Sequence, residues 1–168
     1  DGEGGLYFLA GSGRQVCLWR STDGGRTFTA GVIPGREGQS RFYDIEQFSG
    51  HNAGQDAGAP PPVARFTHTE SDPKLFWRRL NDLELFLPKV VDGRLVMGQP
   101  ILISRKSLGQ SGHSGAPSCL VSGGGKVHLV WAEATEPGEN APGVPTYAVT
   151  YDRASGKLGR PRLVGYGA

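Results

Sequence analysis

The sequence contains little cysteine, and its cysteines carry no metal-binding pattern. Only two of the 168 residues are cysteines, and Cys17 and Cys119 lie in separate apolar segments without the short paired spacing of zinc ligands. We therefore expect no metal site and no cofactor, and the sequence favours two buried free thiols over a disulfide.

Long apolar runs and a strong net charge are also absent. No run approaches the ~20 apolar residues of a membrane-spanning helix, and no signal peptide opens the sequence. The formal net charge is only +2, which is too small to indicate a nucleic-acid partner. We therefore expect neither a membrane nor a nucleic acid among the partners.

Helical patterns are missing too, whereas residues that form turns are abundant. The 27 glycines and 12 prolines make up about a quarter of the chain, but the many Val, Leu, Ile and aromatic residues argue against disorder. A helical turn is conceivable over residues 72–81, and no longer helix is indicated. Short apolar runs between Gly- and Pro-rich turns predict one all-β domain.

One stretch predicts a particular turn. Residues 21–28, Ser-Thr-Asp-Gly-Gly-Arg-Thr-Phe, lie between strand-like segments and form a strong hairpin signal. Glycine allows positive φ, and the Ser and Asp side chains can accept hydrogen bonds from nearby backbone N–H groups. The order Ser-x-Asp-x-Gly-x-Thr-aromatic matches the Asp box, the repeat of bacterial neuraminidases. Its defining positions here are Ser21, Asp23, Gly25, Thr27 and Phe28.

Weak internal repeats predict three tandem units, 1–39, 40–105 and 106–168. Ser49-Gly50-His51 recurs as Ser111-Gly112-His113, and Asp92-Gly93-Arg94-Leu95 aligns with Ser155-Gly156-Lys157-Leu158, in both cases after about 60 residues. The Gly-Arg of the Asp box precedes Gly93-Arg94 by a similar distance. The expected strands are 6–10, 16–19 and 27–33 in the first unit, 42–45, 63–68, 82–87 and 99–103 in the second, and 116–121, 126–131, 146–151 and 160–164 in the third.

These units have the pattern of propeller blades. Apolar residues alternate along 127–131 and along 147–151, as on strands with one buried face. About three four-stranded antiparallel blades, the first incomplete, predict an all-β fold that is a segment of a β-propeller. Fewer than three full blades cannot close a ring, so we expect the remaining blades of a parent propeller as partners. A complete β-sandwich is the alternative.

The third unit carries a wider resemblance. Segments 111–117, 126–131 and 145–158 resemble the BNR-repeat-containing family, which is similar in fold to sialidases and includes polysaccharide lyases of the ulvan-degrading type. The resemblance implies a secreted or periplasmic protein that acts on carbohydrate or polysaccharide as a lyase or glycoside hydrolase. The sequence lacks an Arg-Ile-Pro motif and keeps one intact Asp box, which disfavours a sialidase. A non-catalytic propeller module that binds glycan or protein is the alternative function, and the sequence leaves open whether the protein is an enzyme.

Two histidines are the leading catalytic candidates. Because His51 and His113 follow the same Ser-Gly pair, we interpret their loops as equivalent connections into innermost strands, which gather at one mouth of a propeller channel. Imidazole can exchange protons near neutral pH. The resemblance to uronate lyases implies His113 as base or acid, with His51 and Tyr43 beside it. Hydrogen bonding of these histidines to loop backbone is the structural alternative.

The substrate-binding candidates are two arginines and a tryptophan. Arg41 or Arg65 would neutralise the substrate carboxylate, and Trp77, beside two arginines in an irregular segment, would stack on a sugar. The Asp-box hairpins of a propeller lie on the outer rim, so we expect the Asp-box residues to be structural.

Overall fold

The protein is described by a computed structural model for residues 4–12, 15–35, 47–49, 59–71, 78–110, 117–132 and 144–167. Within these ranges every regular element is a β-strand and none is a helix. The predicted all-β class is therefore confirmed. The strands form three larger antiparallel sheets and one two-stranded hairpin, and none of the sheets closes into a barrel.

The first sheet contains the Asp-box hairpin. Its strands are β1 (Leu6–Ser12), β2 (Gln15–Ser21) and β3 (Thr29–Val32), in the order β1-β2-β3. The three strands predicted in this unit are confirmed, although β3 starts later than expected because Thr27 belongs to the turn. A backbone hydrogen bond of 2.9 Å from Ile33 N to the Val16 carbonyl continues the pairing beyond β3.

The second sheet has the order β4-β5-β6-β9. Its strands are β4 (Gln47–Ser49), β5 (Val63–Ser71), β6 (Arg78–Phe86) and β9 (Ile101–Gln110). The helical turn expected over 72–81 is wrong for residues 78–81, because β6 continues the ladder there with Arg79 opposite Ser71. The strand expected at 42–45 lies outside the described residues. The predicted unit boundary after residue 105 falls within β9.

Between β6 and β9 the chain forms a separate hairpin. β7 (Lys89–Val91) pairs with β8 (Arg94–Val96) through a tight turn at Asp92 and Gly93. Both turn residues have positive φ, 49° and 76°, as a two-residue type I′ turn requires. The Asp-Gly signal in the sequence therefore marks a real turn.

The third sheet is again an up-and-down arrangement. Its strands are β10 (Pro117–Gly123), β11 (Lys126–Ala132), β12 (Val144–Asp152), β13 (Lys157–Leu158) and β14 (Arg162–Gly167). The order is β10-β11-β12, with both β13 and β14 paired to β12. Counting β13 with β14 as one interrupted outer strand, this sheet has the four-strand pattern that the sequence predicts.

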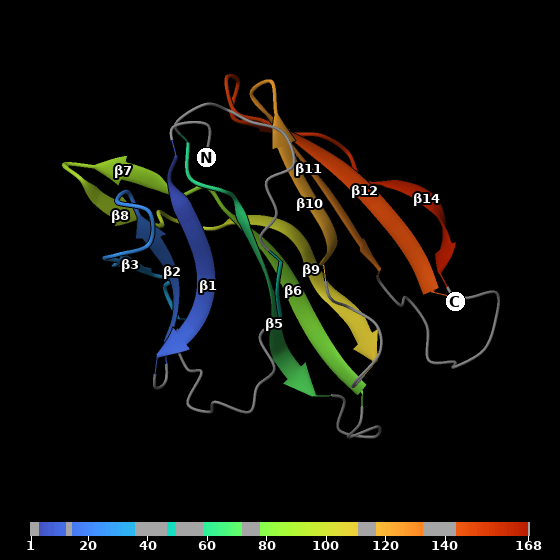
Figure 1. The fold of residues 1–168 in the computed structure, drawn as a ribbon. Coiled ribbons are helices and arrows are strands. Elements are labelled where there is room, and N and C mark those ends of the chain that lie inside the picture. The colour runs from blue at the N-terminus through green and yellow to red at the C-terminus, as the bar shows by residue number, and fades with distance from the viewer. Residues whose placement is uncertain are drawn as a thin grey trace.

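The three sheets lie face to face, with the second in the middle (Figure 1). One apolar cluster joins the first sheet and the β7–β8 region to the second sheet; it comprises Leu18, Ile33, Val63, Phe86, Leu95 and Met97. The other cluster joins the second and third sheets; it comprises Ala64, Leu83, Leu85, Ile103, Val127, Leu129, Trp131 and Val149. Because successive strand residues point to opposite faces, Val63 and Ala64 enter different clusters, and the second sheet is buried on both faces around these residues.

Candidate functional site

The Asp box is held by a set of hydrogen bonds centred on Asp23. The Ser21 hydroxyl donates to Asp23 Oδ1 at 2.8 Å, and Oδ1 also accepts from the backbone N–H groups of Arg26 and Thr27 at 2.9 Å. The Thr27 hydroxyl donates to Oδ2 at 2.6 Å. The Gly25 N–H in turn donates to Ser21 Oγ at 2.8 Å. These bonds satisfy the backbone N–H groups of Gly25, Arg26 and Thr27 in the turn.

The end of the Asp box packs against β1. Gly25 has φ of 88°, and its Cα approaches the Leu6 side chain closely enough that an added Cβ would lie 3.6 Å from Leu6 Cδ1. The Phe28 ring meets the Phe8 ring edge-on with centroids 5.0 Å apart. Phe8 in turn stacks on Trp19 across the β1–β2 ladder, at 6.0 Å. The aromatic position of the motif thus ties the turn to the sheet.

These contacts decide what Asp23 can do chemically. Hydrogen bonds from the Thr27 hydroxyl, then from the Thr27 backbone N–H and the Ser21 hydroxyl, lower the pKa of Asp23 from 3.8 to about 2. A carboxyl group with this pKa is ionised at neutral pH and is not a proton donor for catalysis. Its geometry fits a structural role in the turn.

The third sheet has a related turn that no sequence signature marks. Asp152, at the end of β12, accepts hydrogen bonds at Oδ1 from the Ser155 backbone N–H at 2.8 Å and from the Ser155 hydroxyl at 3.0 Å. The Ser155 backbone hydrogen bond is the largest cause of a lowered pKa at Asp152. The signal in the sequence is Asp-x-x-Ser, which is too short to be specific on its own.

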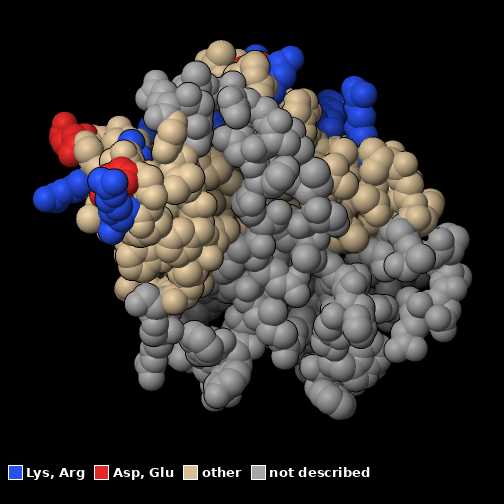
Figure 2. Space-filling view, in the orientation of Figure 1, with Lys and Arg blue, Asp and Glu red and all other residues tan. Residues whose placement is uncertain are grey.

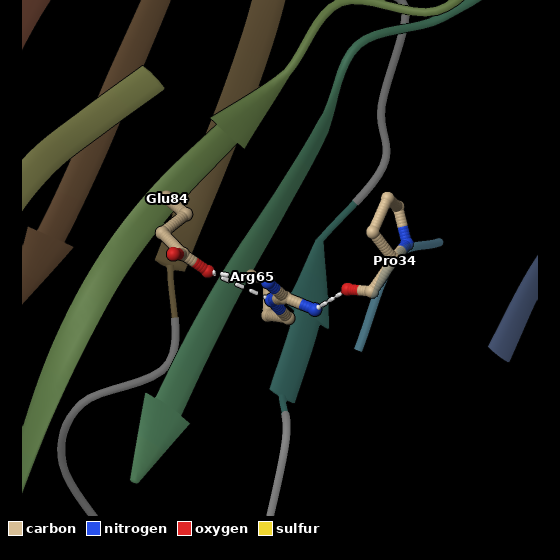
Figure 3. A network of polar contacts seen from close by, with 3 residues as sticks. All are labelled: Pro34, Arg65 and Glu84. Carbon is tan, nitrogen blue, oxygen red and sulfur yellow. Dashed lines mark hydrogen bonds and ion pairs between the residues drawn. The ribbon is translucent and has the colours of Figure 1, made fainter. Parts of the chain in front are cut away.

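Arg65 lies in the interior, facing the first sheet. It is 2% exposed, and its Nε and Nη2 contact Glu84 Oε2 at 2.8 and 2.7 Å. Its Nη1 donates to the Pro34 carbonyl just beyond β3 (Figure 3), and its guanidinium lies 4.8 Å from the centre of the Phe86 ring. The predicted role of Arg65 as a partner of a substrate carboxylate is not supported by this geometry, because the carboxylate it binds is Glu84.

Glu84 is a residue that sequence reasoning missed. It stands directly opposite Arg65 in the β5–β6 ladder and is also buried. The available signal was a charged residue inside each of two apolar strand segments, Val-Ala-Arg-Phe and Leu-Glu-Leu-Phe. A buried charge is stable only when paired, so each of these residues indicated a buried partner, although the identity of that partner depends on strand register.

The remaining site candidates lie outside the described residues. They are His113, His51, Tyr43, Arg41 and Trp77, and their roles stay predictions. Cys17 is a buried free thiol, as predicted.

The strands that precede His51 and His113 contradict the expectation that their two loops are equivalent. Ser49 ends β4, the first strand of the second sheet, whereas Gln110 ends β9, its last strand. In an up-and-down order of four strands, the first and the last strand run in opposite directions. The C-terminal ends of β4 and β9 therefore lie at opposite ends of the sheet along the strand direction. The pairing of Ser49 with Ala64 and of Gln110 with Arg78 separates them by about 20 Å along the strands, at ~3.3 Å per residue. The loops of His51 and His113 are therefore not equivalent connections.

Within the described residues no cluster of three or more His, Cys, Asp or Glu side chains could hold a metal ion. A separate search of the same ranges finds no helix with the length and apolar character needed to cross a membrane.

Comparison with known proteins gives no assignment. No protein-family model, no curated protein and no solved structure matches the chain.

Proposed function

We propose that the chain forms three adjacent blades of a sialidase-like BNR β-propeller, and that this propeller acts on extracellular carbohydrate as a polysaccharide lyase or glycoside hydrolase. The observation that carries the proposal is the hydrogen-bonded Asp box. Its five defining residues make the contacts of a closed turn between β2 and β3, where β3 is the edge strand of its sheet. The motif is thus present as a structure and not only as a string of residues.

The stacking of the sheets supports the propeller over the β-sandwich. A sandwich has two layers, each with one buried face. Here the second sheet contributes residues to an apolar cluster on each of its faces, Val63 and Phe86 on one and Ala64, Leu83 and Leu85 on the other, as a blade between two others does. The first and third sheets also each carry an aspartate-centred turn before their outer strand, at Asp23 and at Asp152, which supports a common blade plan for these two sheets.

Four charged residues of the described structure are bonded within the fold and are therefore poor candidates for catalysis. Asp23 and Asp152 accept hydrogen bonds within their own turns, and Arg65 is paired with Glu84. His113 therefore remains the leading candidate for the base or acid, with His51 and Tyr43 as further candidates and with Arg41 and Trp77 for substrate binding. Because the two histidine loops start from opposite ends of the second sheet, we assign His113 the primary role and do not require His51 in the same pocket.

A second candidate function is also favoured, because the charged residues Asp23, Asp152, Arg65 and Glu84 are all bonded to other groups of the protein. A propeller whose charged side chains serve structure can act as a binding module for glycan or protein without catalysis. Such a module would bind through its loops and release no product.

Incubation of the full-length protein with uronate-containing polysaccharides and sialylated glycans tests the proposal. A lyase gives an ultraviolet-absorbing unsaturated uronate, and a glycosidase gives new reducing ends. We expect turnover that His113→Ala abolishes, whereas His128→Ala retains it, since His128 is an exposed strand residue bonded to Thr150. Binding without product would favour the binding module. If the protein neither bound these glycans nor released a product, the proposed function would be rejected.

A further inference from the structure

The turn end of the third sheet carries a concentration of positive charge. Residues 117–132 and 144–167 contain five lysines or arginines and one acidic residue, whereas the whole chain has a formal net charge of only +2. Four of these cations are exposed, and we call them the basic edge: Lys126, Lys157, Arg160 and Arg162. Lys and Arg side chains gather over this end of the sheet, at the top and upper right of Figure 2.

Strand register places three cations of the basic edge on one face of the sheet. Lys126 of β11 and Lys157 of β13 are both paired with Asp152 of β12. Arg162 of β14 pairs with Ala148, which lies four residues before Asp152 and therefore on the same side of β12. From ordinary strand spacings, the Cα atoms of Lys126 and Lys157 lie about 10 Å apart, and those of Lys157 and Arg162 about 13 Å apart.

The positive charge of the basic edge is not neutralised within the described structure. Asp152 accepts hydrogen bonds from Ser155 in its own turn, and no cation of the basic edge forms an ion pair with another described residue. The β7–β8 hairpin differs, because Asp92 lies between Lys89 and Arg94 in the sequence. Unpaired charges of one sign repel one another and attract a ligand of opposite charge.

The surface between these cations is open to an extended ligand. Gly159 lies between Lys157 and Arg162 along the sheet edge, where its N–H donates to the Thr150 carbonyl at 2.8 Å, and it is exposed. A polymer can therefore approach the backbone between the two cations. β13 and β14 are at the edge of their sheet, and sheets arranged around a ring diverge with distance from its centre, so these strands stay accessible in the proposed propeller.

We propose that the basic edge binds the sulfate or carboxylate groups of an acidic polysaccharide, as a holding site separate from the candidate catalytic loop. Pro117, four residues after His113, begins β10, and Lys126 follows the turn about 20 Å away at the other end of that strand. A second contact of this kind keeps a long polymer at high local concentration around the protein. The acidic character of the ligand follows from the charges, and its being a polysaccharide rests on the proposed function.

Nucleic acid fits the basic edge less well. Proteins that bind duplex DNA through its backbone typically contact about six to ten phosphates, and the basic edge has four cations. Binding of single strands relies on aromatic side chains that stack on bases. The exposed aromatic residue of β14, Tyr166, lies four residues beyond Arg162 and pairs with Pro145 near the other end of β12.

Binding of the protein to dextran sulfate and to polygalacturonate, with uncharged dextran as the blank, tests the inference. The double variant Lys157→Gln, Arg162→Gln should weaken binding at least about 5-fold, because it removes two charge contacts. The control Lys89→Gln, Arg94→Gln removes the same charge from exposed positions of the β7–β8 hairpin and should change the Kd less than about 2-fold. All four side chains are exposed, so both variants should keep the wild-type Tm.

Three outcomes would each overturn the inference. They are equal loss of affinity in the two double variants, no binding to either acidic polymer, and tighter binding to duplex DNA than to both polymers. Turnover by the wild type is a separate readout of the proposed function. Binding that only Lys157→Gln, Arg162→Gln weakens, without any turnover, would retain the holding site and reject the proposed activity. Turnover combined with equal affinities of the wild type and this variant would do the reverse.

Discussion

At the scale of single residues, Asp23 holds the β2–β3 turn through both carboxylate oxygens. Asp23→Asn removes the charge and one of the two acceptors that serve Thr27 and the backbone. We expect a lower Tm for this variant by thermal denaturation. Asp92→Asn is the matched control, because Asp92 has a φ of 49°, which asparagine adopts readily, and its Tm should change by no more than about 1 °C.

The pH dependence of the same residue provides an independent test. The pKa of Asp23 falls from 3.8 to about 2 on folding, so the folded state binds the proton less tightly than the unfolded state. The stability that the carboxylate contributes is then fully present above about pH 4 and is lost as the pH falls toward 2. The difference in free energy of unfolding between wild type and Asp23→Asn should shrink across this window. A difference that stays constant from pH 2 to 7 would contradict the role of the charge.

At the scale of elements, the buried pair of Arg65 and Glu84 joins β5 and β6 to the end of β3. Glu84→Ala leaves the guanidinium buried without its carboxylate and should cost about 3–5 kcal/mol in the free energy of unfolding. The double variant Arg65→Met, Glu84→Leu should be less destabilised than Glu84→Ala, because it removes both charges. Denaturant unfolding of the two variants measures this, and a double variant at least as destabilised as Glu84→Ala would contradict the role of the unpaired charge.

The contact between β3 and the β7–β8 hairpin depends on a glycine. A Cβ on Gly31 would lie 3.0 Å from both Cγ and the carbonyl oxygen of Leu95. Gly31→Ala should therefore destabilise the protein by about 1–3 kcal/mol through overpacking. Gly35→Ala is the control, since nothing lies within 4 Å of its added Cβ. Similar unfolding free energies for the two variants would show that the hairpin does not pack tightly on β3.

Local features of the fold could be predicted from the sequence, whereas features that depend on strand pairing could not. The alternation of apolar residues along 127–131 predicted β11, and the Asp-Gly pairs at 23–24 and 92–93 predicted two turns. Both signals are local in the sequence. The extension of β6 back to Arg78 and the pairing of Arg65 with Glu84 depend on strand register, which local patterns do not encode. The equivalence of the two Ser-Gly-His segments failed because three matching residues say nothing about strand order.

At the scale of the whole molecule, the second sheet is the element that defines the architecture. Its Arg65 side packs on the first sheet and its Leu85 side on the third, so the three sheets follow one another in chain order. In the proposed propeller, carbohydrate chemistry would be carried by loops at the strand ends, with the Asp-box turn on the outside.

The most direct test of this account is an experimental structure of the full-length protein. The proposed propeller predicts a closed ring in which residues 1–168 supply three consecutive blades, with β4 and β10 innermost. A two-layer sandwich would contradict it.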